Sequence, residues 1–485
     1  MNTFMNGLVN ENNFGLTENG AVKHLTTKSA VLDMFALCGS YRNRSDADCI
    51  LAFKNALEEN ETLAMKCLFY LRDIRGGQGE RRFFRVCFKW LADARPEAAR
   101  RNLNNVAEYG RWDDLIYSCL NTKLQGDMLA IVKHQLALDV ECKTPSLLAK
   151  WLPSENASAR NTKIAGSAIR VYLGISHKEY RKMLSVLRSR INIVEKLMSE
   201  NRWDEIEFDK IPSKAGIIYK NAFARRDIIA KKYESFAKDE TKTVNAATLN
   251  PVDIAHRAFE YRYRTGSDTD RAMLQKYWDN QKDYYNGREE NGIAVVDVSG
   301  SMSGTPMEAA VSMGAYIAER GHGPFANHFI TFSESPRLVK FEGVDIVDKF
   351  LRCKCADWGY NTNIERVLDM MLKIARDKDT KPEDIPTRLY IFSDMEFDAG
   401  MSTHGRNKDT LFEAHAKKWA AYGYEMPQVV FWNLDARTQN IPAMGGRFSY
   451  VSGFSMSMVE TILSGKDGYS LMLEKLMSKR YEAVA

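Results

Sequence analysis

A carboxylate and two hydroxyls follow one another at alternate positions in Asp297, Ser299 and Ser301, directly after the apolar run of residues 293–296. The run predicts a short buried strand, and Gly300 lets the following loop bend closely. The three oxygen-bearing side chains can therefore turn toward one point at the carboxyl end of a strand, where open α/β sheets bind ligands. Hard oxygen donors without Cys or His favour Mg²⁺, Mn²⁺ or Ca²⁺ over zinc. We expect a divalent-cation site here, with Mg²⁺ as the first choice.

Two later loops offer further ligands for the same cation. Thr362 lies in a turn before a predicted helix, and Asp394 ends a predicted strand over residues 389–392. Two carboxylates and three hydroxyls leave room for water or for a ligand's carboxylate. For the first loop alone, the alternative is a Ser- and Gly-rich turn that binds no metal.

These loops need a sheet to hold them, and the chain after Gly292 alternates between strand and helix patterns. Strands are expected at 293–296, 329–332, 389–392, 429–432 and 448–451, and helices at 307–319, 364–375 and 411–422. Such alternation predicts an α/β domain with a mostly parallel sheet covered on both faces.

The preceding half of the chain has helical periodicity from about residue 29 to 239. Phe84, Cys87, Phe88 and Leu91 fall on one helix face, and Ser176 with Glu179 forms a capping box. The run at 111–115, Arg-Trp-Asp-Asp-Leu, returns as Arg-Trp-Asp-Glu-Ile at 202–206, which suggests repeated helical pairs in an α-solenoid. We expect an irregular lead-in at 1–25, a helical module at 26–260, a linker at 261–288 and the α/β domain at 289–485.

The charge is unevenly spread along the 485 residues. Residues 1–280 hold 44 Lys and Arg against 35 Asp and Glu, whereas residues 281–485 hold 24 against 28. Most of the positive excess lies at 151–250, with 19 against 12. A basic surface favours a polyanion such as RNA, although solvated faces without a partner are the alternative. Eight scattered cysteines, no apparent signal peptide and no long apolar run lead us to expect a cytoplasmic protein.

Two groups of basic residues are candidates for RNA binding. The first lies around one helix-turn-helix stretch and comprises Arg160, Lys163, Arg170, His177, Lys178 and Arg181. The second follows a Gly-Gly turn and comprises Arg75, Arg81 and Arg82. Cations spaced along a surface contact phosphates, and His177 could stack on a base or donate to a phosphate. The alternatives are an ordinary exposed helix start for His177 and a tight inter-helix turn for the second group.

The Asp-x-Ser-x-Ser sequence, the later Thr and the Asp closing a later strand resemble the metal-ion-dependent adhesion site of von Willebrand A domains. The resemblance covers about residues 290–480. It implies that Ser299, Ser301 and Thr362 bind the metal directly, and that Asp297 and Asp394 bind it directly or through water. Asn361 precedes the Thr where Gly is more usual.

The stretches at 71–82, 110–115, 176–181 and 201–215 resemble the TROVE module of Ro proteins over about residues 15–260, in the divergent form found in phages and bacteria. The resemblance implies a ring of HEAT-like repeats followed by a von Willebrand A domain. It also implies binding of single-stranded ends of non-coding RNAs in the ring and of small structured RNAs on its basic surface, with His177 on the cavity helix.

We therefore expect a monomeric, non-enzymatic protein that binds non-coding RNA and carries a divalent cation. The alternative is a metal-dependent protein-binding module, whose cation takes an acidic residue from a partner, on a helical scaffold without RNA. A metal-dependent hydrolase is disfavoured because no His or Lys base lies near the acids in sequence.

Overall fold

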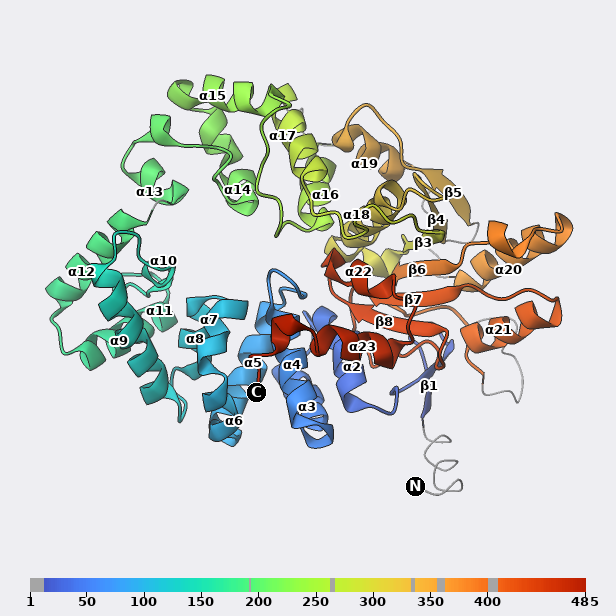
Figure 1. The fold of residues 1–485 in the computed structure, drawn as a ribbon, viewed down its shortest axis with the longest axis horizontal. Helices are drawn as coiled ribbons and strands as arrows, with labels where there is room; N and C mark the ends of the chain where they lie inside the picture. Colours follow the sequence, from blue (N-terminus) through green and yellow to red (C-terminus); the bar gives the residue numbers. More distant parts are fainter. Residues whose placement is uncertain (1–12, 192, 262–266, 333–335, 356–362, 400–408) are drawn as a thin grey trace. The chain divides into compact units, whose positions relative to one another are not determined.

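The computed structural model describes residues 13–191, 193–261, 267–332, 336–355, 363–399 and 409–485 (Figure 1). The chain forms two compact units. The sheet unit comprises residues 1–67 and 246–478, and the helical unit comprises residues 68–245 and 479–485. This division differs from the expected succession of 1–25, 26–260, 261–288 and 289–485. Residues 13–67 pack with the sheet, and residues 479–485 pack with the helices.

The sheet unit is built on six strands in the order β5-β4-β3-β6-β7-β8 (Figure 1). Neighbouring strands are parallel except β4 and β5, which are antiparallel. The five predicted strands are confirmed to within one residue at each end, whereas the exposed edge strand β5 was not predicted. The strands are β3 (Gly292–Asp297), β4 (His328–Phe332), β5 (Arg337–Lys340), β6 (Arg388–Ser393), β7 (Gln428–Asn433) and β8 (Phe448–Ser452).

Helices cover both faces of this sheet. Helix α18 (Thr305–Arg320) leads from β3 to β4, α20 (Ile364–Asp377) leads into β6, and α21 (Leu411–Ala421) leads from β6 to β7. The connection through α18 moves from β3 toward β4, whereas the connections through α20 and α21 move the other way, toward β6 and β7. Because parallel crossovers are right-handed, α18 lies on one face of the sheet and α20 and α21 lie on the other. All three helices were predicted from sequence. Gly314 lets α18 approach β3, since a Cβ there would lie 2.4 Å from Val296 Cγ2.

Residues 13–25, the described part of the expected irregular lead-in, contain a hairpin of the sheet unit, which corrects that expectation for these residues. Residues 14–16 (β1) and 22–24 (β2) form an antiparallel pair, and α2 (Ala30–Leu37) packs on β8. His24 exchanges backbone hydrogen bonds with Ile441, and the Gly39 amide donates to Ser452 Oγ at 2.9 Å. Polar composition suggested a loop, but these long-range hydrogen bonds hold the segment on the C-terminal half of the chain.

The remaining helices of the sheet unit are α3 (Asp46–Glu59), α16 (Pro251–Glu260), α17 (Asp268–Asp279), α19 (Ile346–Cys355), α22 (Val459–Ile462) and α23 (Gly468–Leu476). Helix α17 falls within the expected linker at 261–288, yet it packs on α19. Arg271 donates through Nε and Nη2 to both carboxylate oxygens of Asp345, each at 2.7 Å. The sequence of α17 is rich in charged residues, so its apolar face was not recognised. That face is formed by the buried residues Met273, Leu274, Tyr277 and Trp278.

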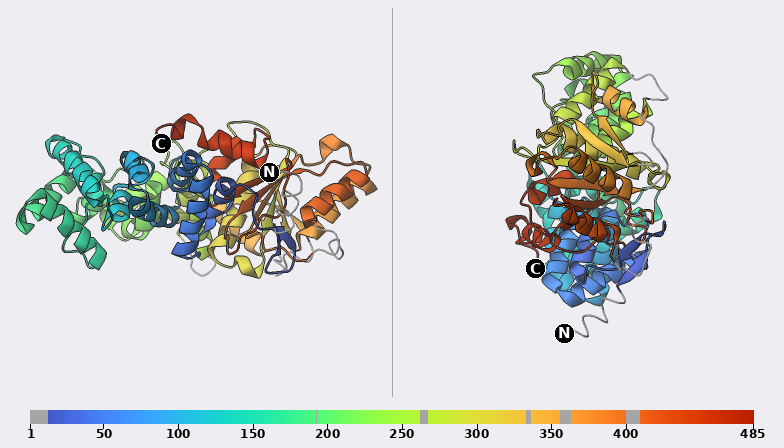
Figure 2. Two further views of the ribbon diagram at one scale, coloured as in Figure 1. Left: turned by 90° about the horizontal axis from the view of Figure 1, so that it is seen from below. Right: turned by 90° about the vertical axis from the view of Figure 1, so that its right-hand side faces the viewer.

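The helical unit has no named strand among its described residues (Figure 2). The predicted amphipathic segment is confirmed as α5, in which Phe84, Cys87, Phe88 and Leu91 are fully buried, and the Ser176–Glu179 capping box starts α12. The helices are α4 (Glu61–Arg72, which begins in the sheet unit), α5 (Arg81–Ala94), α6 (Pro96–Arg101), α7 (Leu103–Tyr109), α8 (Trp112–Cys119), α9 (Gln125–Glu141), α10 (Leu148–Trp151), α11 (Arg160–Leu173), α12 (His177–Arg190), α13 (Val194–Ser199), α14 (Ser213–Ala224) and α15 (Asp227–Lys238). No helix within the described ranges is long and apolar enough to cross a bilayer.

Candidate metal and nucleic-acid sites

Asp297 is the last residue of β3, and Asp394 directly follows the adjacent strand β6. The chain leaves β3 for β4 and β5 on one side, and it returns to β6, β7 and β8 on the other. Doubly wound sheets bind ligands in the crevice at such a reversal of strand order. Both carboxylates are buried, Ser299 is buried, and Ser301 is exposed with its Oγ 3.1 Å from Ser299 Oγ. The structure thus brings four of the five predicted metal ligands to one edge of the sheet.

The two acids share a buried, polar environment. Asp297 accepts from the Ser299 amide at 2.9 Å and from Ser393 Oγ at 2.6 Å. Burial and the nearby charge of Asp394 raise the pKa of Asp297 to about 7. Burial also raises the pKa of Asp394. Two buried carboxylates with hydroxyls beside them favour binding a proton or a cation. This all-oxygen donor set fits a hard divalent cation such as Mg²⁺.

The fifth predicted ligand, Thr362, lies outside the described residues. Asn363, the next residue, caps α20 by accepting from the Arg366 amide at 3.2 Å. The prediction for Thr362 therefore stays a prediction.

Arg437 lies beside Asp394 and also contacts Glu18 of the N-terminal hairpin, an arrangement that was not predicted from the sequence. Arg437 Nη2 lies 2.7 Å from Asp394 Oδ2 and 3.1 Å from Glu18 Oε2. The Glu18 amide donates to Glu396 Oε2 at 2.8 Å, and Thr17 Oγ1 donates to the Phe397 carbonyl at 2.7 Å. The turn between β1 and β2 is thus fixed against the segment that carries Asp394. No short-range pattern connects residue 18 with residue 437.

A second group of side chains that could hold a metal ion lies between α20 and α21. Glu365, Asp369 and His415 each offer a ligand atom within 4.8 Å of the others. Sequence reasoning missed this cluster. The i, i+4 spacing of the two acids places them on one helix face, but their partner histidine is on another helix.

The first basic group lies on α11 and α12 of the helical unit. Arg160, Lys163, Lys178 and Arg181 are exposed there. Arg170 and His177 instead meet at Glu155, which accepts from Arg170 Nε and contacts His177 Nδ1, both at 2.8 Å. Burial raises the pKa of the Glu155 carboxyl, but hydrogen bonds from Arg170 and His177 outweigh burial and hold it below its usual value. The His177 side chain is 69% exposed although one ring nitrogen is fixed.

The second basic group surrounds the Gly76–Gly77 turn, which packs closely against other parts of the helical unit. A Cβ on Gly76 would lie 2.7 Å from Arg480 Cδ, and one on Gly77 would lie 1.8 Å from the Tyr70 carbonyl oxygen. Gly76 therefore leaves room for Arg480 of the C-terminal segment, and Gly77 allows the turn to pack against the backbone of α4. Arg75 is tied to the Glu108 carbonyl at 2.9 Å, while Arg81 is exposed and Arg82 is half-buried.

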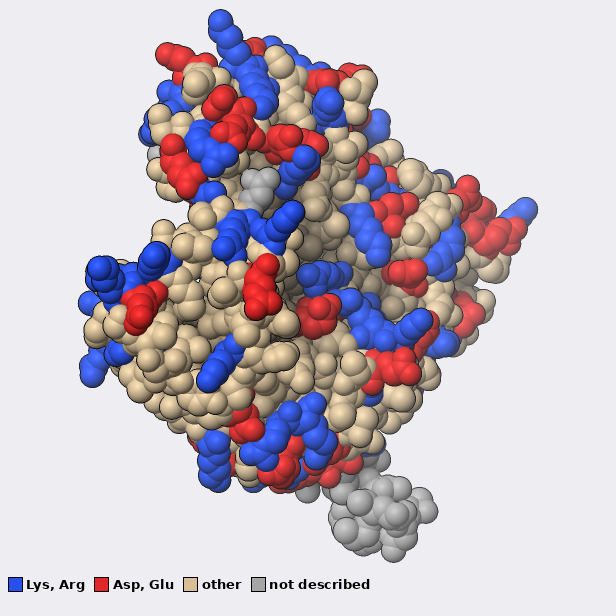
Figure 3. All heavy atoms as spheres, turned by 60° about the vertical axis from the view of Figure 1, so that its left-hand side comes forward, with Lys and Arg blue, Asp and Glu red and all other residues tan. Residues whose placement is uncertain are grey.

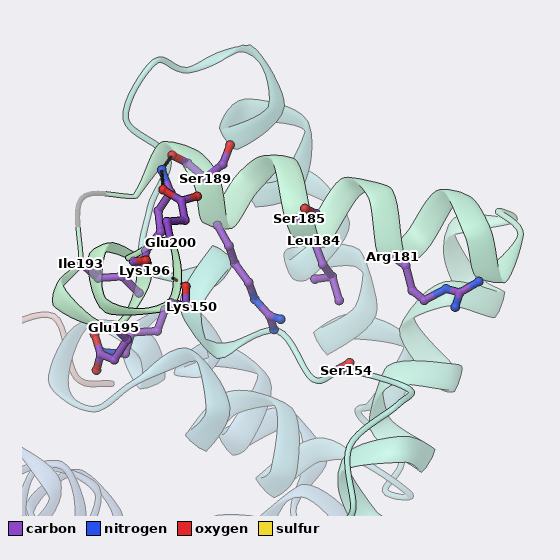
Figure 4. A pocket seen from close by; sticks show the side chains of 12 residues that line it. Lys150, Ser154, Arg181, Leu184, Ser185, Ser189, Ile193, Glu195, Lys196 and Glu200 are labelled. Atoms are coloured by element: carbon purple, nitrogen blue, oxygen red, sulfur yellow. Dashed lines mark hydrogen bonds and ion pairs between the residues drawn. The ribbon is translucent and has the colours of Figure 1, made fainter. Parts of the chain in front are cut away.

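A cleft of about 460 Å³ borders α12 and α13 and extends the first basic group (Figure 4). Arg181 lies at one end of the cleft, while Lys150 and Lys196 lie toward the other, beside Glu195 and Glu200. Lys150 pairs with Glu195 at 2.9 Å, and Arg188 donates to the Leu152 carbonyl at 2.7 Å. Figure 3 likewise shows Lys and Arg interleaved with Asp and Glu rather than one continuous basic face. Exposed cations such as Arg181 are therefore more accessible to an anion than the cations that pair with acids.

The fold and the sites define a class of two-part proteins. One part is a mostly helical N-terminal region, and the other is a mostly parallel sheet whose carboxyl edge gathers acids and hydroxyls. The chain belongs to the family described as Domain of unknown function (DUF2828), whose model matches residues 17–141 and 118–297. A second model, Domain of unknown function (DUF7788), matches residues 291–482. Protein L728 of Acanthamoeba polyphaga mimivirus is 31% identical to this chain over 499 residues, which cover 94% of the chain and 85% of the relative.

Among solved structures, the crystal structure of the Deinococcus radiodurans Ro (RSR) protein aligns with 93% of this chain and 99% of that chain. The sequence identity is 14% and the TM-score is 0.44. A likeness this distant transfers no binding residue to the present chain.

Proposed function

We propose that the protein binds single-stranded RNA through α11 and α12, in the manner expected of a Ro-type protein. Arg160, Lys163, Lys178 and Arg181 would contact phosphates, and His177 would contact a base or a phosphate. The wider proposal includes HEAT-like repeats for the helical unit and a von Willebrand A domain for the sheet unit. The role is binding rather than catalysis.

The observation that carries this proposal is the bridge from Arg170 through Glu155 to His177. Glu155 fixes His177 Nδ1 and leaves the rest of an exposed ring accessible. An imidazole oriented in this way loses less side-chain freedom on binding than a freely rotating one. Within the described part of the chain, Arg160, Lys163 and Lys178 make no ion pair, so their charges remain available to a polyanion. A positioned ring beside available cations suits a single strand with unstacked bases.

Removing the available cations tests this proposal. A variant with Lys163→Ala, Lys178→Ala and Arg181→Ala should lose RNA that co-purifies with the wild type at low salt. The matched control, with Lys89→Ala, Lys143→Ala and Lys231→Ala, removes the same charge from exposed positions elsewhere in the helical unit. Equal RNA recovery from both variants, or no RNA with the wild type, would contradict the proposal.

A second candidate function rests on the sheet edge. Asp297, Ser299, Ser301 and Asp394 would hold Mg²⁺, with Thr362 as a further ligand, and an open coordination position would accept an acidic residue of a protein partner. The exposed Ser301 hydroxyl beside two buried acids favours this role. Mg²⁺ titration calorimetry on the full chain tests it, and the variant Ser299→Ala with Ser301→Ala should lose the binding heat. Ser303→Ala, an exposed serine of the same loop, is the control.

A further inference from the structure

The buried face of α21 contains one polar ring among large apolar side chains. Leu411, Phe412 and Trp419 pack into the core, and His415 on the same face has no exposed surface. Neither ring nitrogen of His415 has a hydrogen-bond partner. A buried polar group normally has such a partner, and an exception calls for an explanation such as an ion. The unpaired imidazole therefore has hydrogen-bonding and lone-pair capacity that an ion could satisfy.

Two carboxylates of α20 face this ring. His415 Nε2 lies 3.8 Å from Glu365 Oε1, and His415 Nδ1 lies 3.9 Å from Asp369 Oδ1. Glu365 is 7% exposed, whereas the Asp369 side chain is 46% exposed. Both separations exceed hydrogen-bond length.

We propose that Glu365, Asp369 and His415 form a site for a divalent first-row transition-metal ion, with Zn²⁺ as the representative case. An imidazole nitrogen with two carboxylates suits Zn²⁺ better than Mg²⁺ or Ca²⁺, which prefer oxygen donors alone. Three protein ligands leave a fourth position for water. The site is separate from the all-oxygen edge at Asp297, and it depends on neither function proposed above.

The geometry requires only small movements. Bonds of about 2.0–2.2 Å in a tetrahedral site place ligand atoms about 3.4 Å apart. One ligand atom of each residue now lies within 4.8 Å of the others, so the three must draw closer to bind one metal. A metal bound to His415 Nε2, the nitrogen nearer Glu365, would bind Asp369 after this half-exposed side chain rotates toward it. Lys418 Nζ now lies 2.6 Å from Asp369 Oδ1, and its side chain is 41% exposed. The metal would displace this ammonium group into solvent.

The metal would join two helices that pack side by side (Figure 1). Glu365 and Asp369 lie in the first two turns of α20, directly after the segment that contains Thr362, and His415 lies in the middle of α21. A metal bond between them would hold the start of α20 against α21. It would thereby stabilise the helical layer on this face of the sheet.

Cobalt substitution tests the proposal on the metal-free full-length chain. Co²⁺ is titrated in millimolar Mg²⁺, so that the oxygen-only edge is occupied by Mg²⁺. We expect the chain to bind one equivalent of Co²⁺ and to show the intense visible bands typical of four-coordinate cobalt. Added Zn²⁺ should displace the Co²⁺ and abolish these bands. Asp369→Asn, at a half-exposed position, and Glu365→Gln should weaken this binding at least tenfold. Circular dichroism establishes that both variants fold.

Two variants serve as controls. Asp377→Asn removes an exposed acid near the end of α20, and Asp297→Asn removes an acid of the sheet edge. Both should keep the cobalt bands. Absence of bands with the wild type, or unchanged bands with Glu365→Gln and Asp369→Asn, would overturn the proposal. Bands lost in Asp297→Asn alone would assign the ion to the sheet edge and would also overturn it.

Discussion

The guanidinium of Arg437 donates to Asp394 across 2.7 Å, so a fixed positive charge contacts one of the two acids at the carboxyl edge of the sheet. Glu18 holds the same nitrogen from the other side at 3.1 Å. The arginine neutralises part of the negative charge that would attract a cation, while it also orients Asp394. Through Glu18, the N-terminal hairpin would therefore influence how strongly this edge binds the proposed cation.

Arg437→Gln should therefore strengthen divalent-cation binding. Loss of the nearby positive charge lowers the repulsion on an incoming Mg²⁺. We expect a gain of about three- to tenfold, or about 0.7–1.4 kcal/mol, by titration calorimetry. Arg447→Gln, whose arginine pairs with Glu425, is the control and should leave the affinity unchanged. Weaker binding by Arg437→Gln would show that the arginine acts mainly by positioning Asp394.

The C-terminal segment should stabilise the helical unit in a pH-dependent way. Asp73 is buried and accepts from Arg480 Nη2 at 2.6 Å and from Tyr481 Oη at 3.0 Å. Burial raises its pKa, but the hydrogen bonds from Arg480, Arg75 and Tyr481 outweigh burial and hold the pKa below its usual value. A carboxyl with a depressed folded pKa contributes stability above its unfolded pKa near 4, and that stability is lost as the pH falls through the folded value.

Arg480→Gln should accordingly lower the free energy of unfolding by about 2 kcal/mol at pH 7, since the arginine is partly exposed and screened. The deficit should shrink as the pH falls below about 4, and it should disappear once the pH is below the depressed folded pKa of Asp73, where the carboxyl is protonated in both proteins. Urea unfolding at both pH values measures it. A deficit independent of pH would mean that Arg480 stabilises the fold by packing rather than by its charge.

The Gly-Gly turn offers a test of backbone packing. A Cβ on Gly77 would lie 1.8 Å from the Tyr70 carbonyl oxygen, whereas Gly79, at φ +69°, has no atom near its Cβ position. Gly77→Ala must shift the backbone and should cost about 3 kcal/mol or more of unfolding free energy. Gly79→Ala meets only left-handed strain of about 1 kcal/mol. Equal losses for the two variants would refute the close approach at Gly77.

How much the sequence predicted depended on the range of the interaction. The positions of Asp297 and Asp394 at the ends of two strands were predicted correctly, because apolar strands are local signals, while their role as metal ligands stays a prediction. Arg437 contacts Asp394 at the same edge, but it also contacts Glu18, which lies in a hairpin more than 400 positions earlier in the chain. A contact over that distance in sequence leaves no local signal. The histidine of the α20–α21 cluster was likewise invisible, since His415 lies in a sequence window that looks like ordinary core.

The Gly76–Gly77 turn shows a different limit. Its composition fits a backbone that approaches a phosphate equally well as one that receives another part of the same chain. The structure favours the second, because a Cβ on Gly76 would lie only 2.7 Å from Arg480 Cδ. The basic residues around α11 and α12 could be named from sequence, but Glu155, which organises two of them, gave no separate signal.

The Glu155 bridge should be coupled to RNA binding through His177. We expect Glu155→Gln and His177→Ala each to weaken binding of a single-stranded oligonucleotide by about three- to tenfold, since each leaves the ring unpositioned or absent. The double variant should bind no more weakly than His177→Ala, which a double-mutant cycle detects. Tighter binding by Glu155→Gln would mean that the carboxylate acts only by repelling phosphates.

The salt dependence of RNA affinity tests the central claim most directly. Binding of a labelled single-stranded RNA is measured over a range of salt concentrations for the wild type, for Lys163→Ala with Lys178→Ala and Arg181→Ala, and for the control with Lys89→Ala, Lys143→Ala and Lys231→Ala. Each phosphate contact to a single strand contributes a slope of about 0.7 to the fall of log affinity with log salt. The account predicts a slope smaller by roughly two in the first variant and unchanged in the control. Equal slopes in all three proteins would contradict RNA binding at α11 and α12.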